Sequence, residues 1–561
     1  MLNLIMRLTR CLFLVFAVTC VPFSHLMAQR DLVPVSDPVY KFLLRQELNG
    51  TLNGFHWGML PLSRSEIAGF LDSLEASASL SATDRGLLRD LKVKLSYDVS
   101  HTLSGSTAIL PEGGFTSLFD DDRQKYLYAY ADSTASVFVD GFGSYSYRGA
   151  KGDSTGSTFA SLGEIGVRVR GTLFDHLGFY LQASNGKLLS GSHQFALMDP
   201  RLAANDKFNS DARGYFDLTN GYMRYDVGWL TLMVGREQIL WGMGYGDRLV
   251  FSDNTVPFDF IRLDLRSGSL RYTFLHGSLV GADTNGHTLS SKYIASHRVE
   301  FNIGSRFRLG LAEAIVYSRQ PPSLALMNPL AFLTSVDQSI QLPVDNAHKK
   351  HIWIDAEAFP VRKLRLSGTL MIDDLDFGTL GHSDVSGNDN KFGWQGGVLW
   401  QDAFSANNLA LSLEYTRIGP FVGAHREIVS TYTNWGLPLG QELQPNSDEW
   451  MLLAEYDISP RIGVSGKFQF QRTGENIVDA NGNILFNAGS DLLNGEGDDV
   501  HPNVFLEGLR VNRFLATIGF TWQPVRQYFL EFTYFYRYFD YPSESRTLRD
   551  NIAWTTLRVD F

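Results

Sequence analysis

The chain ends on the stretch Ala553-Trp554-Thr555-Thr556-Leu557-Arg558-Val559-Asp560-Phe561. Its odd-numbered positions are mostly apolar, whereas the even-numbered ones include an arginine and an aspartate. A strand that spans a membrane in a β-barrel needs this alternation, because neighbouring side chains face lipid and lumen in turn. A terminal aromatic residue after such a strand is typical of bacterial outer-membrane barrels. The tail therefore predicts that the chain closes on a spanning strand.

The same alternation recurs in many segments, among them 162–183, 364–372, 462–471, 513–522 and 528–538. A charge that faces lipid at mid-depth costs about 2–4 kcal/mol. We therefore expect the charges within these strands to face the lumen: Glu164, Arg168, Arg170, Glu531 and Arg537. At roughly 20–28 residues for each strand with its loop, residues 121–561 predict a barrel of about 16–20 antiparallel strands. The alternative is a soluble array of β-sandwiches.

Residues 1–28 are predicted to be a secretory signal peptide. Arg7 and Arg10 precede an apolar run, and Met27-Ala28 offers a small-residue cleavage site. Lipidation at Cys20 is the alternative. Both cysteines of the chain lie in this segment, so the mature chain has no thiol for a disulfide or a metal site.

Charge and hydropathy narrow the class of protein further. Removing the two arginines of residues 1–28 from a net charge of -11 leaves -13, which disfavours nucleic acid as a partner. After residue 28 no apolar run reaches the roughly 18 residues of a transmembrane helix. A membrane protein without such helices is a closed barrel, because backbone groups in lipid must all be paired. We therefore predict an all-β transmembrane barrel in the outer membrane of a Gram-negative cell.

Residues 29–120 show a helical period instead. A short helix is expected over 38–46, and Ser63 to Glu66 resembles a capping box before a second helix. Ser81 or Thr83 could cap a third. We predict a small periplasmic helical segment that acts as a plug or lid, or as a docking surface for an export partner.

A central motif resembles the outer-membrane capsule-assembly proteins of the Wzi type. The motif residues are Gly235, Arg236, Glu237, Trp241, Gly242, Asp253, Asn254 and Pro257. Its companions are His297, Arg298, Glu300, Glu313, Asn328-Pro329 and Asp373-Asp374. Together with the N-terminal segment, the similarity covers nearly the whole mature chain.

The resemblance implies a barrel of about eighteen strands with a helical periplasmic domain. It also implies a lectin that retains exported capsular or extracellular polysaccharide at the cell surface. The expected partners are that polysaccharide, outer-membrane lipid and a polysaccharide export apparatus on the periplasmic side. The protein is expected to be a monomer without cofactor or metal.

The residues of the motif can also be interpreted by their chemistry. Its glycines lack the spacing of a nucleotide loop, so we expect them to permit a tight inward fold of the backbone. Arg236, with Glu237, Arg298, Glu300 and Glu313, would form an ion-pair network in the lumen. That network either holds the barrel rigid or contacts a ligand, and Trp241 is either a packing residue or a platform for a sugar ring.

Three polar segments, 381–391, 424–447 and 489–503, are predicted to be long external loops, and Asn481-Gly482 is predicted to form a hairpin turn. Aromatic faces stack on sugar rings, and polar side chains bond hydroxyl or acidic groups. The candidate glycan contacts in these loops are His425, Arg426, Tyr432, Asn434 and Trp435. The alternative is an ordinary membrane girdle or exposed loop. An acidic run at 496–499 offers too few oxygens for Ca²⁺.

Two other functions remain open. The histidines of the barrel show no spacing of a Ser-His-acid set, and Asp373 and Asp374 would face opposite sides of a strand, so no catalytic residues are predicted. A porin-like solute channel is the main alternative, because a barrel of this size could leave an open lumen.

Overall fold

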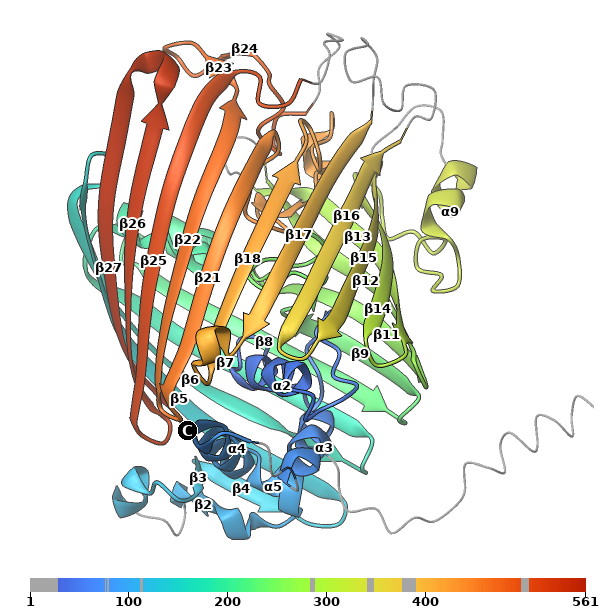
Figure 1. Cartoon of the computed structure of the whole chain (residues 1–561), viewed down its shortest axis with the longest axis vertical. Helices are drawn as coiled ribbons and strands as arrows, with labels where there is room; N and C mark the ends of the chain where they lie inside the picture. The colour runs from blue at the N-terminus through green and yellow to red at the C-terminus, as the bar shows by residue number, and fades with distance from the viewer. Residues whose placement is uncertain are drawn as a thin grey trace, which may run out of the picture.

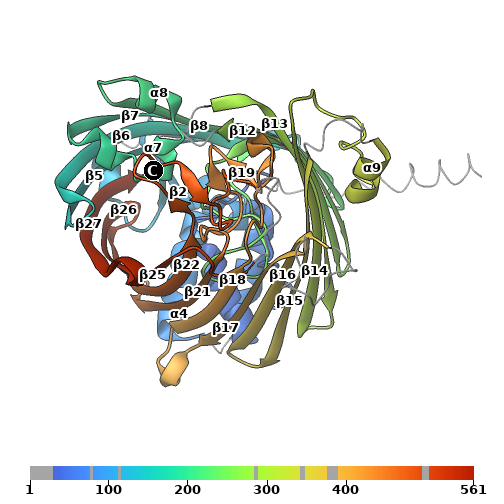
Figure 2. The same cartoon turned by 90° about the horizontal axis from the view of Figure 1, so that it is seen from above.

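The computed structural model describes residues 29–75, 77, 80–110, 115–282, 288–340, 348–375, 390–495 and 504–561. Within these residues, eighteen long antiparallel strands form a closed barrel (Figures 1 and 2). The strand count lies in the predicted range and confirms the fold class. The predicted signal peptide, the acidic run at 496–499 and most of the 381–391 loop lie outside the described residues.

The barrel strands follow one another around the wall in chain order. They are β5 (Ala135–Gly152), β6 (Gly156–Leu173), β7 (Leu177–Gly191), β8 (Tyr215–Asp226), β9 (Leu230–Glu237), β11 (Phe258–Ser267), β12 (Leu270–Ala282), β13 (Thr288–Ile303), β14 (Phe307–Ser318), β15 (His348–Val361), β16 (Leu364–Asp374), β17 (Lys391–Gln401), β18 (Leu409–Ile418), β21 (Ser447–Ser459), β22 (Ile462–Glu475), β25 (Leu509–Val525), β26 (Tyr528–Tyr541) and β27 (Arg546–Asp560).

Shorter elements lie between these strands and before them. They are β1 (Met59–Leu60), β2 (Ser106–Ala108), β3 (Gln124–Tyr126), β4 (Tyr128–Ala131), β10 (Leu240–Trp241), β19 (Thr433–Asn434), β20 (Leu437–Pro438), β23 (Ile477–Val478), β24 (Ile484–Phe486), the 3₁₀ turns η1 (Leu103–Gly105), η3 (Phe115–Phe119), η4 (Ala403–Ser405), η5 (Ile428–Ser430) and η6 (Pro542–Glu544), and the helices α6 (His193–Ala196), α7 (Pro200–Ala203), α8 (Asp206–Ser210) and α9 (Leu333–Ile340). Strands β23 and β24 form the predicted hairpin around Gly482.

The last strand closes the barrel as predicted. β27 pairs with β26 on one side and with β5 on the other. The Phe561 N–H donates to the Gly141 carbonyl (2.8 Å), and β4 takes over the edge of β5 beyond that point. The terminal residues therefore join the end of the chain to the first long strand.

Alternation sorts the wall into an apolar exterior and a charged interior. Ile165 and Leu557 face outward and are 73% and 54% exposed, whereas the charges between such positions pair inside. The inward pairs that involve predicted lumenal residues are Arg168–Asp560, Arg170–Asp140, Arg537–Asp550 and Arg558–Glu531. Outside, one register row across five strands is aromatic throughout: Tyr415, Trp450, Phe470, Phe514 and Tyr538.

In the described part of the chain, four helices precede the barrel: α2 (Val39–Leu48), α3 (Arg64–Glu75), α4 (Ala82–Lys94) and α5 (Ser96–Ser100). Ser63 and Glu66 form the predicted capping box, and Ser81, not Thr83, caps α4. The helices pack at one end of the barrel, where their apolar cluster includes the inward residues Leu399 and Ala410 (Figure 1). Among the described residues, no helix has the length and apolar character to cross a membrane. The predicted domain boundary at residue 120 stays a prediction.

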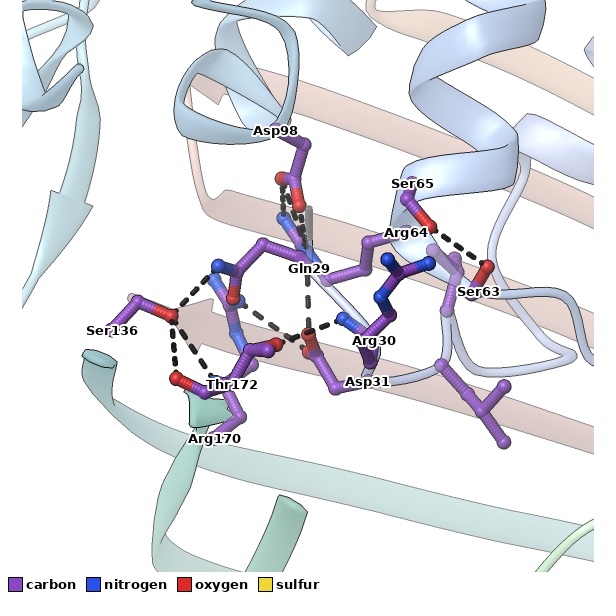
Figure 3. Close-up of polar contacts among 12 residues, drawn as sticks. Gln29, Arg30, Asp31, Ser63, Arg64, Ser65, Asp98, Ser136, Arg170 and Thr172 are labelled. Carbon is purple, nitrogen blue, oxygen red and sulfur yellow. Dashed lines mark hydrogen bonds and ion pairs between the residues drawn. The ribbon is translucent and has the colours of Figure 1, made fainter. Parts of the chain in front are cut away.

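The first described residues are fastened to the barrel wall (Figure 3). The Gln29 side chain donates to Ser136 Oγ (2.7 Å), and the Arg30 N–H donates to Thr172 Oγ1 (2.9 Å). Asp31 is fully buried between Arg170 (3.5 Å) and Arg64 (4.0 Å). These contacts hold the helical segment at a fixed position against β5 and β6.

Candidate functional site: the filled lumen and the external mouth

The motif segment leaves the barrel wall after β9 and folds into the lumen. β10 pairs with β1 of the N-terminal segment, and the Gly242 N–H donates to the Gly58 carbonyl (3.1 Å). Farther along, the Asn254 side chain donates to the Pro438 carbonyl (2.9 Å) in the loop between β18 and β21. Residues 238–257 therefore join the N-terminal helices to the loop between β18 and β21. We call residues 238–257 and 419–446 together the lumenal plug.

Glycine permits the tight turn at the centre of this plug, as predicted. A Cβ on Gly244 would lie 1.7 Å from the Asp247 carbonyl oxygen, so no side chain fits there. Trp57 Nε1 donates to the Gly244 carbonyl (2.8 Å), and its ring stacks on Tyr245. Glu414 of β18 accepts the Tyr245 N–H (2.7 Å). The turn is thus held by the helical segment on one side and by the wall on the other.

A buried ion-pair network ties the wall to the N-terminal segment. Arg298 of β13 is 0% exposed and forms a bidentate pair with Asp355 of β15 (2.6 and 2.8 Å). Its neighbour Glu300 contacts Arg298 (3.4 Å) and His56 Nδ1 (2.6 Å). The predicted lumenal pairing of Arg298 with Glu300 is therefore present, with Asp355 as the stronger partner.

The network continues through a second arginine pair. Arg308 contacts Glu357 and also Glu47 of α2, and Arg365 contacts the other oxygen of Glu357. Arg365 also donates to the Met243 carbonyl in the plug. Because these groups are buried and mutually paired, their placement fits a structural role.

Two motif residues do not join this network as predicted. Arg236 lies on the outward face of β9 and pairs with Asp259 of β11 (2.6 and 3.0 Å), so the prediction that it faces the lumen is wrong. Glu237 does face inward and is buried, but its carboxylate accepts a hydrogen bond from the neighbouring Gln238 N–H instead of pairing with an arginine of the network. The register of β9 with β8 and β11 is regular here, so strand alternation alone places Arg236 outside and Glu237 inside.

Glu313 was also predicted to join the lumenal network, but both Glu313 and the motif companion His297 face outward. They lie on the parity opposite to Arg298 and Arg308, and His297 Nε2 contacts Glu313 (2.8 Å). Glu313 also accepts the Leu333 N–H at the start of α9 (3.2 Å). These two residues therefore bind a loop on the outside of the barrel. Asp373 and Asp374 separate as predicted, since Asp373 is buried beside Lys349 (2.6 Å) and Asp374 is half exposed.

The loop 424–447 starts at the external end of the barrel, as predicted, but it folds inward. Tyr432 is buried against His351, Trp353 and Phe251, and it donates a hydrogen bond to the Val250 carbonyl. Asn434 is buried and accepts the Val280 N–H (2.9 Å). Of the five predicted glycan contacts, the exposed Arg426 and the half-buried His425 and Trp435 are within reach of solvent.

The motif tryptophan and its neighbours follow the packing interpretation. Trp241 is 0% exposed and meets Phe251 edge to face, with ring centroids 5.1 Å apart. Gly242 adopts φ +117°, Asp253 is exposed, and Pro257 is half buried before β11. No sugar ring could stack on Trp241 without unfolding the plug.

A second insertion covers another part of the lumen. Residues 192–214, which carry α6, α7 and α8, form what we call the external cap. Phe195, Leu202 and Phe208 pack against the inward residues Ile552 and Trp554 of β27. The Arg148 side chain of β5 pairs with Asp199 at the N-terminus of α7 (2.8 Å).

Acid should loosen this cap. Burial alone would raise the pKa of Asp199, but Arg201 and Arg148 outweigh it and lower the pKa to about 2. Because this pKa lies below the ordinary value near 3.8, the ionised Asp199 stabilises the cap above pH 4. This stabilisation, about 2 kcal/mol, is lost as Asp199 is protonated between pH 4 and pH 2. A spin label at Ser210 is expected to become more mobile between pH 4 and pH 2, and Asp199→Asn should make it mobile at every pH. Equal mobility at pH 5 and pH 2 would contradict this account.

Several site residues were not identified from the sequence. The ion-pair network also includes four charged residues that were not predicted: Asp355, Glu357, Arg308 and Arg365. Their inward parity on the strands was the sequence signal that could have identified them. The external cap gave no such signal. In the described part of the chain, no group of three or more His, Asp or Glu side chains is arranged to hold a metal ion.

Comparison with known proteins identifies the family. Residues 127–493 match the family described as "Capsule assembly protein Wzi". The chain belongs to the Wzi capsule-assembly family. Among solved structures it is similar to Wzi of Escherichia coli, with 14% identity, a TM-score of 0.58, and coverage of 94% of this chain and 99% of that one. That protein is described as an outer-membrane, carbohydrate-binding β-barrel involved in group 1 capsule assembly.

Other barrels are more distant from this Wzi-family chain. OprD of Pseudomonas aeruginosa matches at 10% identity and a TM-score of 0.43, covering 76% of this chain and 95% of that one. OpdK of the same organism matches at 9% identity and a TM-score of 0.43, covering 76% of this chain and 99% of that one. No curated protein matches the chain. The barrel and the family together place this protein in the outer membrane.

Proposed function

We propose that this barrel binds exported capsular or extracellular polysaccharide at the outer face of the cell, holds it there, and carries out no chemistry. The observation that carries the proposal is the filled lumen in a member of a capsule-assembly family. The N-terminal helices, the lumenal plug and the external cap all pack against inward side chains of the wall. A barrel filled in this way offers its external loops, not a passage, to a polymer.

The chemistry of binding would rest on the accessible part of the mouth. Arg426 and Trp435 supply a cation for acidic groups and an aromatic face for a sugar ring. Tyr432 and Asn434 support that surface from beneath through their bonds to residues 250 and 280. We further propose that the protein acts as a monomer and that the exposed surface of the periplasmic helices receives an export apparatus.

The decisive experiment removes the protein from a capsulated cell. Loss of the chain is expected to release polysaccharide into the medium while total synthesis stays unchanged. In planar bilayers the purified barrel should pass no steady current. Unchanged surface retention, or a steady ionic current, would refute the retention role and favour the porin-like alternative.

Arg426→Ala and Trp435→Ala are each expected to weaken binding of purified barrel to its polysaccharide by about tenfold, which corresponds to about 1.4 kcal/mol. Surface plasmon resonance on immobilised polymer would measure this. Arg213→Ala in the external cap is the matched control, since that side chain is 78% exposed and pairs only locally with Asp211. If the control and the two loop variants bind equally well, the glycan surface lies elsewhere.

A further inference from the structure

Polar residues interrupt the apolar outer wall of β12, β13 and β14. Tyr272, His297 and Glu313 all have outward parity. His297 and Glu313 are companions of the family motif, and neither has a role in the lumen. Glu313 stands six residues from Phe307, where β14 leaves its periplasmic turn. Six residues of a tilted strand rise about 16 Å, well inside an apolar band about 25 Å tall. An unshielded carboxylate at that depth would be costly.

The connection between β14 and β15 covers these residues. We call residues 319–340 the outer-wall loop, and Figures 1 and 2 show its helix α9 beside the barrel, outside the ring of strands. Glu313 accepts the Leu333 N–H and both the N–H and hydroxyl of Thr334. The Tyr272 hydroxyl donates to the Pro329 carbonyl. The loop thus reaches down the wall past Glu313 toward the periplasmic end of β12.

The inner side of the outer-wall loop packs on the barrel. Leu326 and Leu333 are 0% exposed and form a cluster with the outward residues Ala295, Ile315 and Tyr317. Asp337 pairs with two outward side chains of β15, those of His348 and Lys350 (2.7 Å). The loop is therefore a packed layer on the wall, with its polar partners enclosed.

Between residues 324 and 334 the opposite side of the loop is mostly apolar and exposed, with Asn328 as its exposed polar residue. Leu324, Leu330 and Phe332 are 83%, 86% and 56% exposed. They continue the exposed apolar wall beside them, where Leu311 and Ile354 face outward. Apolar side chains on both the loop and the adjacent strands therefore face the same surroundings.

Of the ten N–H groups in residues 324–334, six donate to an oxygen of the protein, and those of Leu324, Ala325, Leu326 and Phe332 do not. The six are those of Met327, Asn328, Leu330, Ala331, Leu333 and Thr334, and residue 329 is a proline without an N–H. Irregular backbone is tolerated at membrane depth where such groups are paired within the protein, and the six paired groups meet that condition.

We propose that residues 324–334 lie within the outer leaflet of the membrane, as an intramembrane anchor whose partner is the acyl chains of membrane lipid. Leu324, Leu330 and Phe332 contact those chains, and the loop shields His297 and Glu313 from them. This interaction surface is separate from the glycan surface proposed above.

Site-directed spin labelling tests the anchor. Cysteine occurs only at positions 11 and 20, within the predicted signal peptide, so the mature chain offers no competing thiol. Leu330→Cys and Phe332→Cys would be labelled in the full barrel, reconstituted in phospholipid vesicles. We expect collisions with oxygen to exceed collisions with a water-soluble nickel chelate at both positions, as in a membrane interior. Ile354→Cys provides the lipid-facing control and Arg213→Cys the aqueous one.

The outcomes separate the possible surroundings. If the label at residue 330 matches residue 213 in its nickel accessibility, the loop lies in water and the proposal is overturned. If spectra broaden through spin–spin contact at high but not low protein-to-lipid ratio, a second copy covers the loop, which also overturns it. Folding of each variant is checked by its heat-dependent shift in gel mobility, and the second labelled position replaces any variant that fails to fold.

Discussion

Replacing Arg298 with methionine is expected to lower the free energy of unfolding by about 3–5 kcal/mol, because it leaves buried carboxylates without their cation. Asp355 loses its bidentate partner, and Glu300 loses its contact with Arg298 and keeps its hydrogen bond with His56. Urea titration of the barrel in lipid vesicles, followed by tryptophan fluorescence, would measure the loss. The same variant should loosen the N-terminal segment at His56, which Glu300 holds, and admit small ions to the lumen.

The charge and the volume of Arg298 can be separated with a second variant. Arg298→Met combined with Asp355→Leu removes both ends of the pair and should recover a large part of the lost stability, as in other buried pairs replaced by apolar residues. Arg213→Met is the surface control, with an expected change within about 0.5 kcal/mol. A single variant as stable as the native protein would show that the network does not hold the lumen together.

Gly235→Val is expected to prevent most of the chain from folding, at a cost of about 3–6 kcal/mol. A Cβ at this position would lie 2.2 Å from the Gly221 carbonyl oxygen and 2.4 Å from Tyr222 Cα, on the backbone of β8. The φ of +147° adds strain for any residue with a side chain. The folded fraction, read from heat-dependent gel mobility after refolding into detergent, is the measurement.

A matched glycine shows whether position 235 is special. Gly396 lies in β17 with ordinary φ, and a Cβ there would meet no atom within 4 Å. Gly396→Val should therefore fold almost normally. Equal folding of both variants would mean that the backbone at residue 235 relaxes easily and that the motif glycine has another purpose.

The sequence predicted the barrel because its physical signal is local. Each strand carries a two-residue period, and the last strand shows it up to Phe561, so strand count and closure followed from pattern and length. The capping box at Ser63 was predictable for the same reason, since both partners lie within four residues.

The errors in the site came from assuming that every strand charge faces the lumen. Alternation itself places Arg236 with Leu232 and Val234, and Glu313 with Leu311 and Ile315, on the outer face. In such positions a charge signals a partner or a cover on the lipid side. Asp259 is the partner of Arg236, more than twenty residues away in the chain, and the outer-wall loop is the cover of Glu313.

The inward course of the loops could not be predicted. Residues 424–447 have the composition of an exposed loop, yet Asn434 bonds to residues 256 and 280, more than 150 positions away. Contacts of such separation leave no periodic trace in a single sequence. These long-range contacts bury Tyr432 and Asn434. Only three of the five predicted glycan contacts therefore stay accessible.

The N-terminal helices, the lumenal plug and the external cap fill the interior of the barrel, and this has a consequence for the route of a sugar polymer. A chain of linked sugars several ångströms wide would have to dislodge helices, plug and cap together, against the ion pairs at Arg298 and Arg148. Newly made polymer must therefore cross the envelope by a different conduit. Under the proposed function, this protein meets the polysaccharide only after export, on the outer side of the membrane.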